Sequence, residues 1–173
     1  MILDGYWKKE LERNIRSLET WLKLSCAFSD YAKHQVNKAI LYSAIIMRKM
    51  FEDEKGAEIA LKKADMPMPP LQLLKYKVKV TVYPFVGDKS FIAERVIPDN
   101  YDCNNVVEKE IELNTLCNQI IHSFVWTVAH EQKKHKISGV LFASDKVKDN
   151  VLYLLKPQEF IKAIRFCIEN GNI

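Results

Sequence analysis

Residues 75–82, with the sequence KYKVKVTV, decide the fold class because the hydrophobic period changes there. Every second position from 76 to 82 holds an apolar residue, which is typical of a β-strand with one buried face. Before this segment, apolar residues recur every three or four positions, which predicts amphipathic helices. The chain is therefore expected to be an α+β protein in which the helices come first.

The N-terminal third of the chain, residues 1–66, is expected to be helical. A first helix covers residues 6–28, and a second covers residues 29–51 with Asp30 as its N-cap. Because the connection between them is short, the two helices should form an antiparallel hairpin. A short third helix is expected over residues 57–63, before a group of prolines ends the helical pattern.

The remaining residues, 71–173, should mix helices with strands inside a single domain that spans residues 1–173. A second extended segment is expected over residues 90–97. A long central helix is expected over residues 106–128, because apolar side chains form a wide face there.

A β-hairpin and a final helix complete the predicted fold. Residues 139–143 and 151–155 are short β-type runs on either side of a turn. Pro157 suits the first turn of a C-terminal helix, which Gly171 should end. The predicted architecture is an N-terminal antiparallel helical hairpin, a central helix, a small antiparallel sheet with a hairpin, and a C-terminal helix.

The composition suits a globular protein that needs neither a cofactor nor a metal. Of 173 residues, 48% are hydrophobic, and the net charge of +4 permits nucleic-acid binding without demanding it. The four cysteines form no C-x-x-C pair, so we expect reduced thiols. The N-terminus is charged, and no segment has the length and hydropathy of a membrane span. We therefore expect a cytoplasmic protein with no membrane partner.

The clearest candidate for chemistry lies in residues 116–124, LCNQIIHSF, on the predicted central helix. Asn118 and His122 are four residues apart and must share a helical face. Asn118 can hydrogen-bond the imidazole and select its tautomer, and His122 can then act as a general base or hold a phosphate. The alternative is that His122 is a core or subunit-interface histidine bonded to a backbone carbonyl.

This segment resembles the signature helix of the HEPN superfamily of helical ribonucleases and toxins. The motif of that superfamily is Arg, usually Asn, three further residues, then His, often with Tyr two residues later. Asn118 and His122 match it, whereas Cys117 stands at the Arg position and Phe124 at the Tyr position. The two N-terminal helices also resemble the helical hairpin that precedes this motif, and the two regions together cover less than half of the chain. Residues 113–155 resemble bacterial proteins of unassigned function, which bears on the fold alone.

The resemblance implies a particular use of these residues. In the superfamily, Arg and His converge across a dimer interface, where the guanidinium stabilises phosphate charge while the imidazole moves a proton. Cys117 carries no cation, so the resemblance implies a non-catalytic interaction protein, an accessory component of a bacterial defence or toxin system that binds protein or RNA. Arg48 can replace the cation only if its helix packs beside His122, and we otherwise interpret it as a solvated residue.

Two other functions stay open. One is a metal-independent ribonuclease that uses His122 with a cation from Arg48, Arg165 or a lysine. The other is a structural or assembly module with no nucleic-acid role. In each case we expect a protein partner or self-association, with the copy number open.

Three lysines of residues 75–82 are further binding candidates. Lys75, Lys77 and Lys79 should project from one face of the predicted strand, where they can follow a nucleic-acid backbone. Lysines on a solvated sheet face or an edge strand also discourage unwanted strand pairing, so a purely structural role is the alternative.

Overall fold

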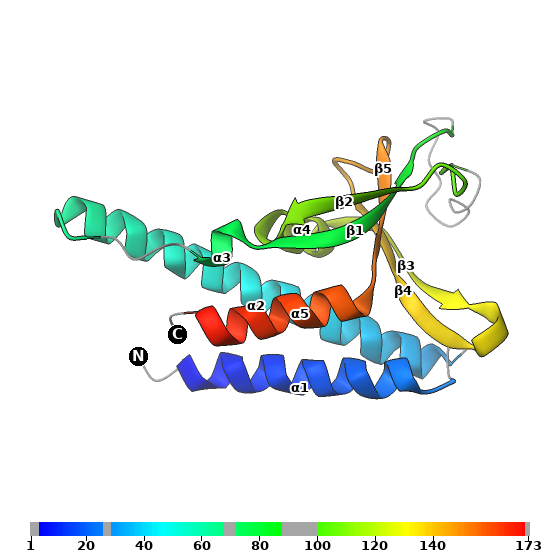
Figure 1. Ribbon diagram of the computed structural model, residues 1–173, viewed down its shortest axis with the longest axis horizontal. Helices are drawn as coiled ribbons and strands as arrows, with labels where there is room; N and C mark the ends of the chain where they lie inside the picture. The colour runs from blue at the N-terminus through cyan, green and yellow to red at the C-terminus, as the bar shows by residue number, and fades with distance from the viewer. Residues whose placement is uncertain (1–3, 26–28, 68–71, 88–99, 172–173) are drawn as a thin grey trace.

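The computed structural model describes residues 4–25, 29–67, 72–87 and 100–171 (Figure 1). Helices α1 and α2 come first, and a mixed α and β part follows, so the predicted α+β class is confirmed. The predicted extended segment at residues 90–97 lies outside the described residues. In chain order the elements are α1 (Asp4–Lys23), α2 (Asp30–Lys63), α3 (Gln72–Lys75), β1 (Lys77–Pro84), β2 (Val107–Glu112), α4 (Leu113–Ile121), β3 (Ser123–Glu131), a 3-10 turn (Gln132–Lys134), β4 (Lys136–Ser144), β5 (Val151–Leu155) and α5 (Pro157–Asn170).

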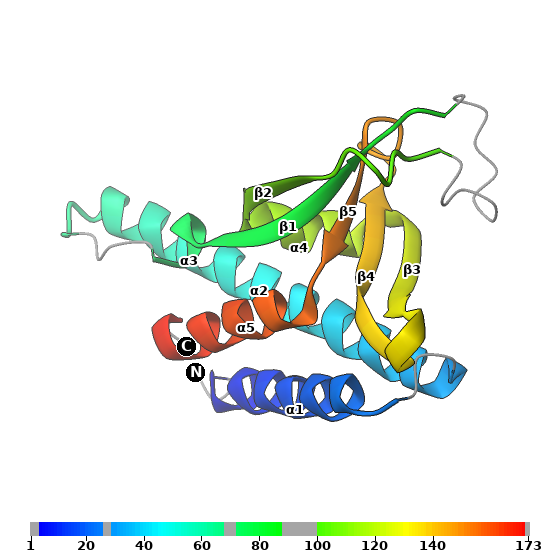
Figure 2. The same cartoon turned by 45° about the vertical axis from the view of Figure 1, so that its right-hand side comes forward.

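The described strands form one antiparallel sheet in the order β2-β1-β5-β4-β3 (Figure 2). The predicted hairpin is confirmed, because β4 and β5 pair with Val140 opposite Leu155 and Phe142 opposite Tyr153. The strand predicted from residues 75–82 is also confirmed, although it begins at Lys77 and not at Lys75, which ends the short helix α3.

Helices α1 and α2 lie antiparallel, which confirms the predicted helical hairpin (Figure 1). Helix α2 is longer than predicted, since the expected third helix is its continuation. Its N-cap is Ser29 and not Asp30, because the Ser29 hydroxyl accepts a hydrogen bond from the backbone N–H of Ala32 at 3.3 Å. Beyond Phe51 no residue of α2 is fully buried, and this end of the helix projects past the other elements.

The prediction of a central helix over residues 106–128 is wrong at both ends. Helix α4 covers only Leu113–Ile121, with β2 directly before it and β3 directly after it. The apolar residue Val107, which suggested a helical face, is 48% exposed on the edge strand β2. Short apolar runs fit either a strand or a helix. Here the segments before and after α4 are strands, because β2 pairs with β1 and β3 pairs with β4.

The main core lies between the sheet and the helices. Strand β1 buries Val78, Val80 and Val82 toward α4 and α5, and the buried stripe of α5 begins at Phe160. The C-terminal helix starts with Pro157 in its first turn and has Gly171 as its C-cap, as predicted. This packing holds α4 against α2, and that contact creates the candidate site.

Candidate functional site

His122 lies directly after the last residue of α4, where it is exposed to solvent. Its backbone N–H donates to the carbonyl oxygen of Asn118 at 3.1 Å. The two side chains line the same cavity, as expected for residues four apart on a helix. Among the described residues, however, no hydrogen bond joins the Asn118 amide to the imidazole, so the predicted role of Asn118 in selecting the tautomer is not found.

The partner of the imidazole is Arg48, which comes from α2. Its Nη1 lies 3.3 Å from Nε2 of His122, and its Nε donates to Glu52 Oε1 at 3.3 Å. A guanidinium can only donate, so Nε2 is the acceptor if this contact is a hydrogen bond. The condition set for Arg48 in the sequence analysis is therefore met, because the packing of α2 on α4 brings its partly exposed side chain to His122.

Cys117, which stands at the Arg position of the HEPN motif, is fully buried. Burial raises the pKa of its thiol well above the usual value, so the group is neutral. Consecutive helical residues point about 100° apart, so Cys117 faces the core while Asn118 lines the cavity. An arginine at position 117 would point into the core, and the cation of this site is supplied by a different helix.

A cavity of about 400 Å³ lies beside His122. Two buried atoms at this cavity, Oε1 of Gln119 and Oγ of Ser144, have no hydrogen-bond partner among the described residues. Buried polar atoms in proteins are nearly always paired, so these two atoms are suited to a polar ligand. The residues that line the cavity are Asn118, Gln119, His122, Ser144, Asp145 and Lys146.

Further cations lie at the rim of this cavity. Lys146 is exposed in the turn after β4, and Lys148 forms an ion pair with Asp145. The Lys148 ammonium also lies 4.8 Å from the centre of the Phe124 ring. Phe124 sits where the β3–β4 pairing is irregular, and its side chain is 45% exposed. The described cavity lining therefore carries charges of both signs, from Asp145 and Lys146, and Lys148 with Phe124 lies next to it.

Sequence reasoning missed the part of the site that β4 and its turn contribute. Ser144 and Asp145 were recognisable only as turn residues between two short strands. Their position beside α4 depends on the pairing of Ser144 with Ser123, the second residue after α4. No local pattern in the sequence indicates that pairing.

The three candidate lysines do not line this cavity. Lys75 ends α3, which corrects the prediction that it shares a strand face with the other two. Lys77 and Lys79 lie directly opposite Glu112 and Glu110 on β2. Cross-strand pairs of opposite charge stabilise a sheet, so this surface alternates in sign and does not form a continuous basic stripe.

The other arginine considered as a cation for His122 is engaged elsewhere. Arg165 of α5 donates to Glu19 of α1 at 2.6 Å. It lines a separate groove between these two helices. Arg48 is therefore the arginine that the structure brings to His122.

Three cysteines fall within the described residues, and all three are free thiols. In the same residues, no group of three or more His, Cys, Asp or Glu side chains is arranged to hold a metal ion. None of the helices described has both the length and the hydropathy needed to cross a membrane.

Comparisons with known proteins gave no match: no family model fits the chain, and no curated protein or solved structure is significantly similar to it.

Proposed function

We propose that the Arg48–His122 pair binds a phosphodiester of single-stranded RNA and cleaves it without a metal ion. The observation that supports this proposal is the guanidinium 3.3 Å from the imidazole, beside a cavity with an unpartnered hydroxyl. The HEPN resemblance implies the same pair of groups, with the arginine coming from position 117. Here Arg48 takes that role from another helix.

The groups present fit each part of the reaction. Nε2 of His122 takes the proton of the ribose 2′-hydroxyl, and the 2′-oxygen forms a bond to phosphorus. Arg48 donates to the non-bridging oxygens, where negative charge develops. The bond from phosphorus to the 5′-oxygen breaks, and this oxygen takes a proton from the Lys146 ammonium or from solvent. The products are a 2′,3′-cyclic phosphate and a 5′-hydroxyl.

The competing function is RNA or protein binding without cleavage, as in an accessory component of a defence or toxin system. One observation favours it: Arg48 occupies the same Nε2 lone pair that a general base needs. Cleavage then requires the guanidinium to turn toward the phosphate and release Nε2. If the guanidinium does not turn, the site binds the phosphate group of the RNA without cleaving it.

The experiment is to incubate the protein with labelled single-stranded RNA in the presence of EDTA and to identify the ends of the products. We expect cyclic-phosphate ends from the wild type and a loss of about 10²–10³-fold in rate for Arg48→Ala. His122→Ala should also lose cleavage. Arg165→Ala is the matched control, because it removes an exposed arginine that pairs with Glu19 away from the cavity.

Binding is measured in parallel by fluorescence anisotropy with the same RNA. Binding without cleavage by the wild type would contradict the ribonuclease and support the accessory function. If Arg48→Ala binds RNA as tightly as the wild type does, the pair is not the phosphate site and both functions lose their support.

A further inference from the structure

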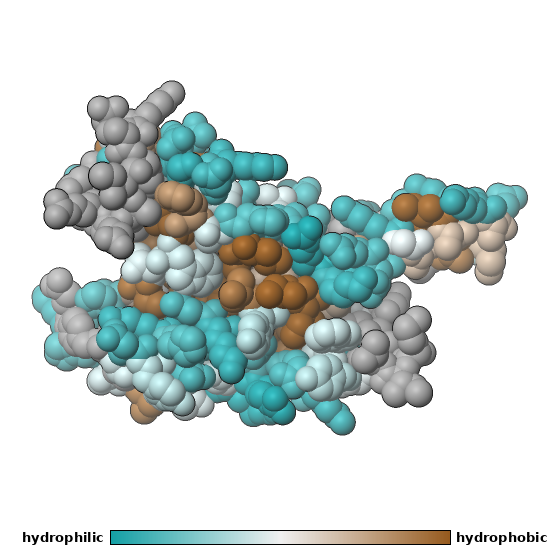
Figure 3. Space-filling model, turned by 180° about the vertical axis from the view of Figure 1, so that it is seen from behind, coloured by the Kyte–Doolittle hydropathy of each residue, from teal (hydrophilic) through white to brown (hydrophobic). Residues whose placement is uncertain are grey.

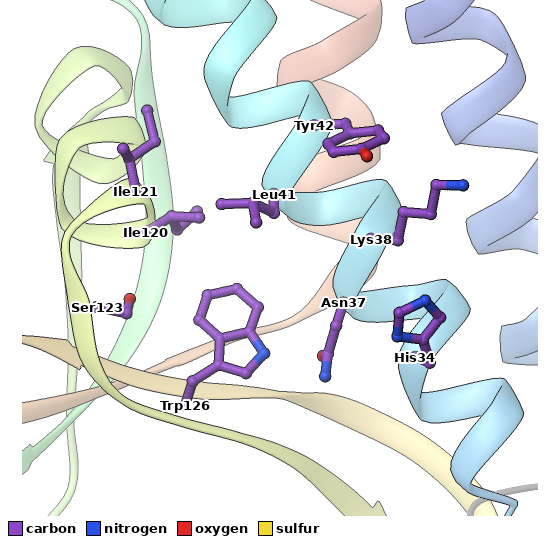
Figure 4. A pocket seen from close by; sticks show the side chains of 9 residues that line it. All are labelled: His34, Asn37, Lys38, Leu41, Tyr42, Ile120, Ile121, Ser123 and Trp126. Carbon is purple, nitrogen blue, oxygen red and sulfur yellow. The ribbon is translucent and has the colours of Figure 1, made fainter.

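A second, larger cavity of about 530 Å³ lies between α2, the end of α4 and β3 (Figure 4). Its volume lies in the range of small-molecule sites. Its lining residue Leu41 is exposed on α2. Seen from the side opposite to that of Figure 1, the molecule has apolar side chains gathered in the middle between hydrophilic borders (Figure 3). The lining residues are His34, Asn37, Lys38, Leu41, Tyr42, Ile120, Ile121, Ser123 and Trp126.

The two cavities flank the end of α4. Ile121 lines the second cavity, and the next residue, His122, lines the first. Ser123 and Ser144, which are direct cross-strand partners, also lie one on each cavity. Asn37 of the second cavity and Arg48 are separated by about 16 Å along α2, at 1.5 Å per residue, so ligand groups at the two places would belong to different nucleotides of one strand.

The walls of the second cavity favour a flat, apolar ring. The indole of Trp126 stands between β3 and α2, and the apolar side chains of Leu41 and Ile120 lie beyond it along the cavity (Figure 4). An indole face is a stacking surface for aromatic rings, and such stacking contributes about 1–3 kcal/mol per nucleic-acid base.

One polar atom restricts the ligand further. Oδ1 of Asn37 is buried and has no partner among the described residues, and the Asn37 amide lies beside the indole ring in Figure 4. A carbonyl oxygen of this kind needs a donor, which a fatty-acid carboxylate cannot supply. A nucleobase supplies an N–H donor next to an acceptor, and an asparagine amide pairs with both.

The mouth of the cavity is basic. His34 and Lys38 are exposed on α2, and the Lys38 ammonium lies 5.6 Å from the centre of the Tyr42 ring. Among the residues that the structure describes, no acidic one lines this cavity. This charge suits a ligand with a phosphate attached to its aromatic part.

We propose that this second cavity is a nucleobase pocket, in which one base stacks on Trp126 and pairs through its edge with Asn37. This inference rests on the proposed function, because the base would belong to the same RNA strand as the phosphate bound by Arg48 and His122. Purines should bind more tightly than pyrimidines, since their two rings cover more of the indole.

The test uses the full chain with Trp7→Phe and Trp21→Phe, which leaves Trp126 as its one tryptophan. Adenosine and AMP are titrated while Trp126 fluorescence is recorded. We expect saturable quenching by both compounds, and about tenfold weaker binding in Asn37→Ala, since the N–H donor of the base then lies buried without a partner, which costs about 1–3 kcal/mol. Asn170→Ala is the control, because that amide donates to Phe166 at the end of α5. Thermal unfolding followed by circular dichroism verifies that each variant is folded.

Three outcomes would overturn the inference: no saturable quenching, equal affinity in Asn37→Ala, or binding of a fatty acid such as decanoate in place of adenosine. Arg48→Ala separates this inference from the proposed function. It should keep its affinity for adenosine, which has no phosphate, while losing RNA cleavage. If the wild type binds adenosine but cleaves no RNA, the base pocket is supported and the ribonuclease is contradicted. If the wild type cleaves RNA but does not bind adenosine, the ribonuclease is supported and the base pocket is contradicted.

Discussion

Arg48 and His122 are 74 residues apart in the sequence, and their side chains meet with Nη1 3.3 Å from Nε2. The guanidinium donates, so it holds the imidazole in the form whose Nε2 carries no proton. A phosphate oxygen that takes over the donor of Arg48 frees the lone pair of Nε2. In the proposed ribonuclease, phosphate binding and the availability of a general base would thereby be coupled in one contact.

Removal of Lys146 should lower the salt dependence of RNA binding. If Lys146 contacts one phosphate, the slope of log K against log salt should decrease in magnitude by about 0.7 for a single strand. The measurement is a series of anisotropy titrations at several salt concentrations. The double variant Lys77→Ala and Lys79→Ala is the control and should leave the slope unchanged, since these lysines face Glu112 and Glu110. If the control lowers the salt dependence more than Lys146→Ala does, RNA binds along the outer face of β1 and not at Lys146.

Restoring the motif arginine by Cys117→Arg should unfold the protein and not activate it. Position 117 is fully buried, and an unpaired charge there is destabilising by several kcal/mol. Urea unfolding should show a large loss of stability or no folded protein. Cys117→Ala, which removes the thiol without adding charge, should stay folded. A stable Cys117→Arg variant with higher cleavage activity would contradict this placement of the cation.

The thiols should differ sharply in reactivity. Cys103 is exposed, whereas burial raises the pKa of Cys167 to about 12 and that of Cys117 well above its usual value. At mildly alkaline pH the two buried groups stay protonated, and the thiolate is the reactive form. Iodoacetamide should therefore label Cys103 in the folded protein and label Cys117 and Cys167 only after denaturation. Peptide mass spectrometry measures this, and rapid labelling of Cys117 in the folded protein would contradict its core position.

Gly139 should not tolerate a side chain. A Cβ at this position would lie 2.5 Å from Cδ1 of Leu154 and 2.9 Å from the backbone oxygen of Leu155. The second contact is with the backbone of β5, which cannot move without disturbing the pairing with β4. Gly139→Ala should therefore cost about 1–3 kcal/mol in unfolding free energy. Gly56→Ala is the control, because nothing lies near its added Cβ.

Much of the fold follows from local patterns in the sequence. The alternation in residues 77–82 gives β1, and Pro157 with Gly171 gives the limits of α5. The error at residues 106–128 arose because apolar side chains at helical spacing continue through α4 into β3. Strand pairing, which links distant residues, decided those boundaries.

The candidate site could be predicted only in part. His122 and Asn118 could be predicted because they are four residues apart at the end of α4, where His122 is the C-cap. Arg48 could be named as a candidate cation, but its contact with His122 could not be predicted, because that contact depends on how α2 packs against α4. The same holds for Asn37 and Trp126, which come from α2 and β3 and meet only in the packed structure.

The most direct test of the Arg48–His122 pair is a double-variant cycle on RNA cleavage. The rates of the wild type, Arg48→Ala, His122→Ala and the combined variant are measured under identical conditions. Groups that act as one unit give strongly non-additive losses, so the combined variant should be no slower than the slower single variant. If the loss of rate in the combined variant equals the product of the two single losses, the two side chains act independently, which would contradict the account.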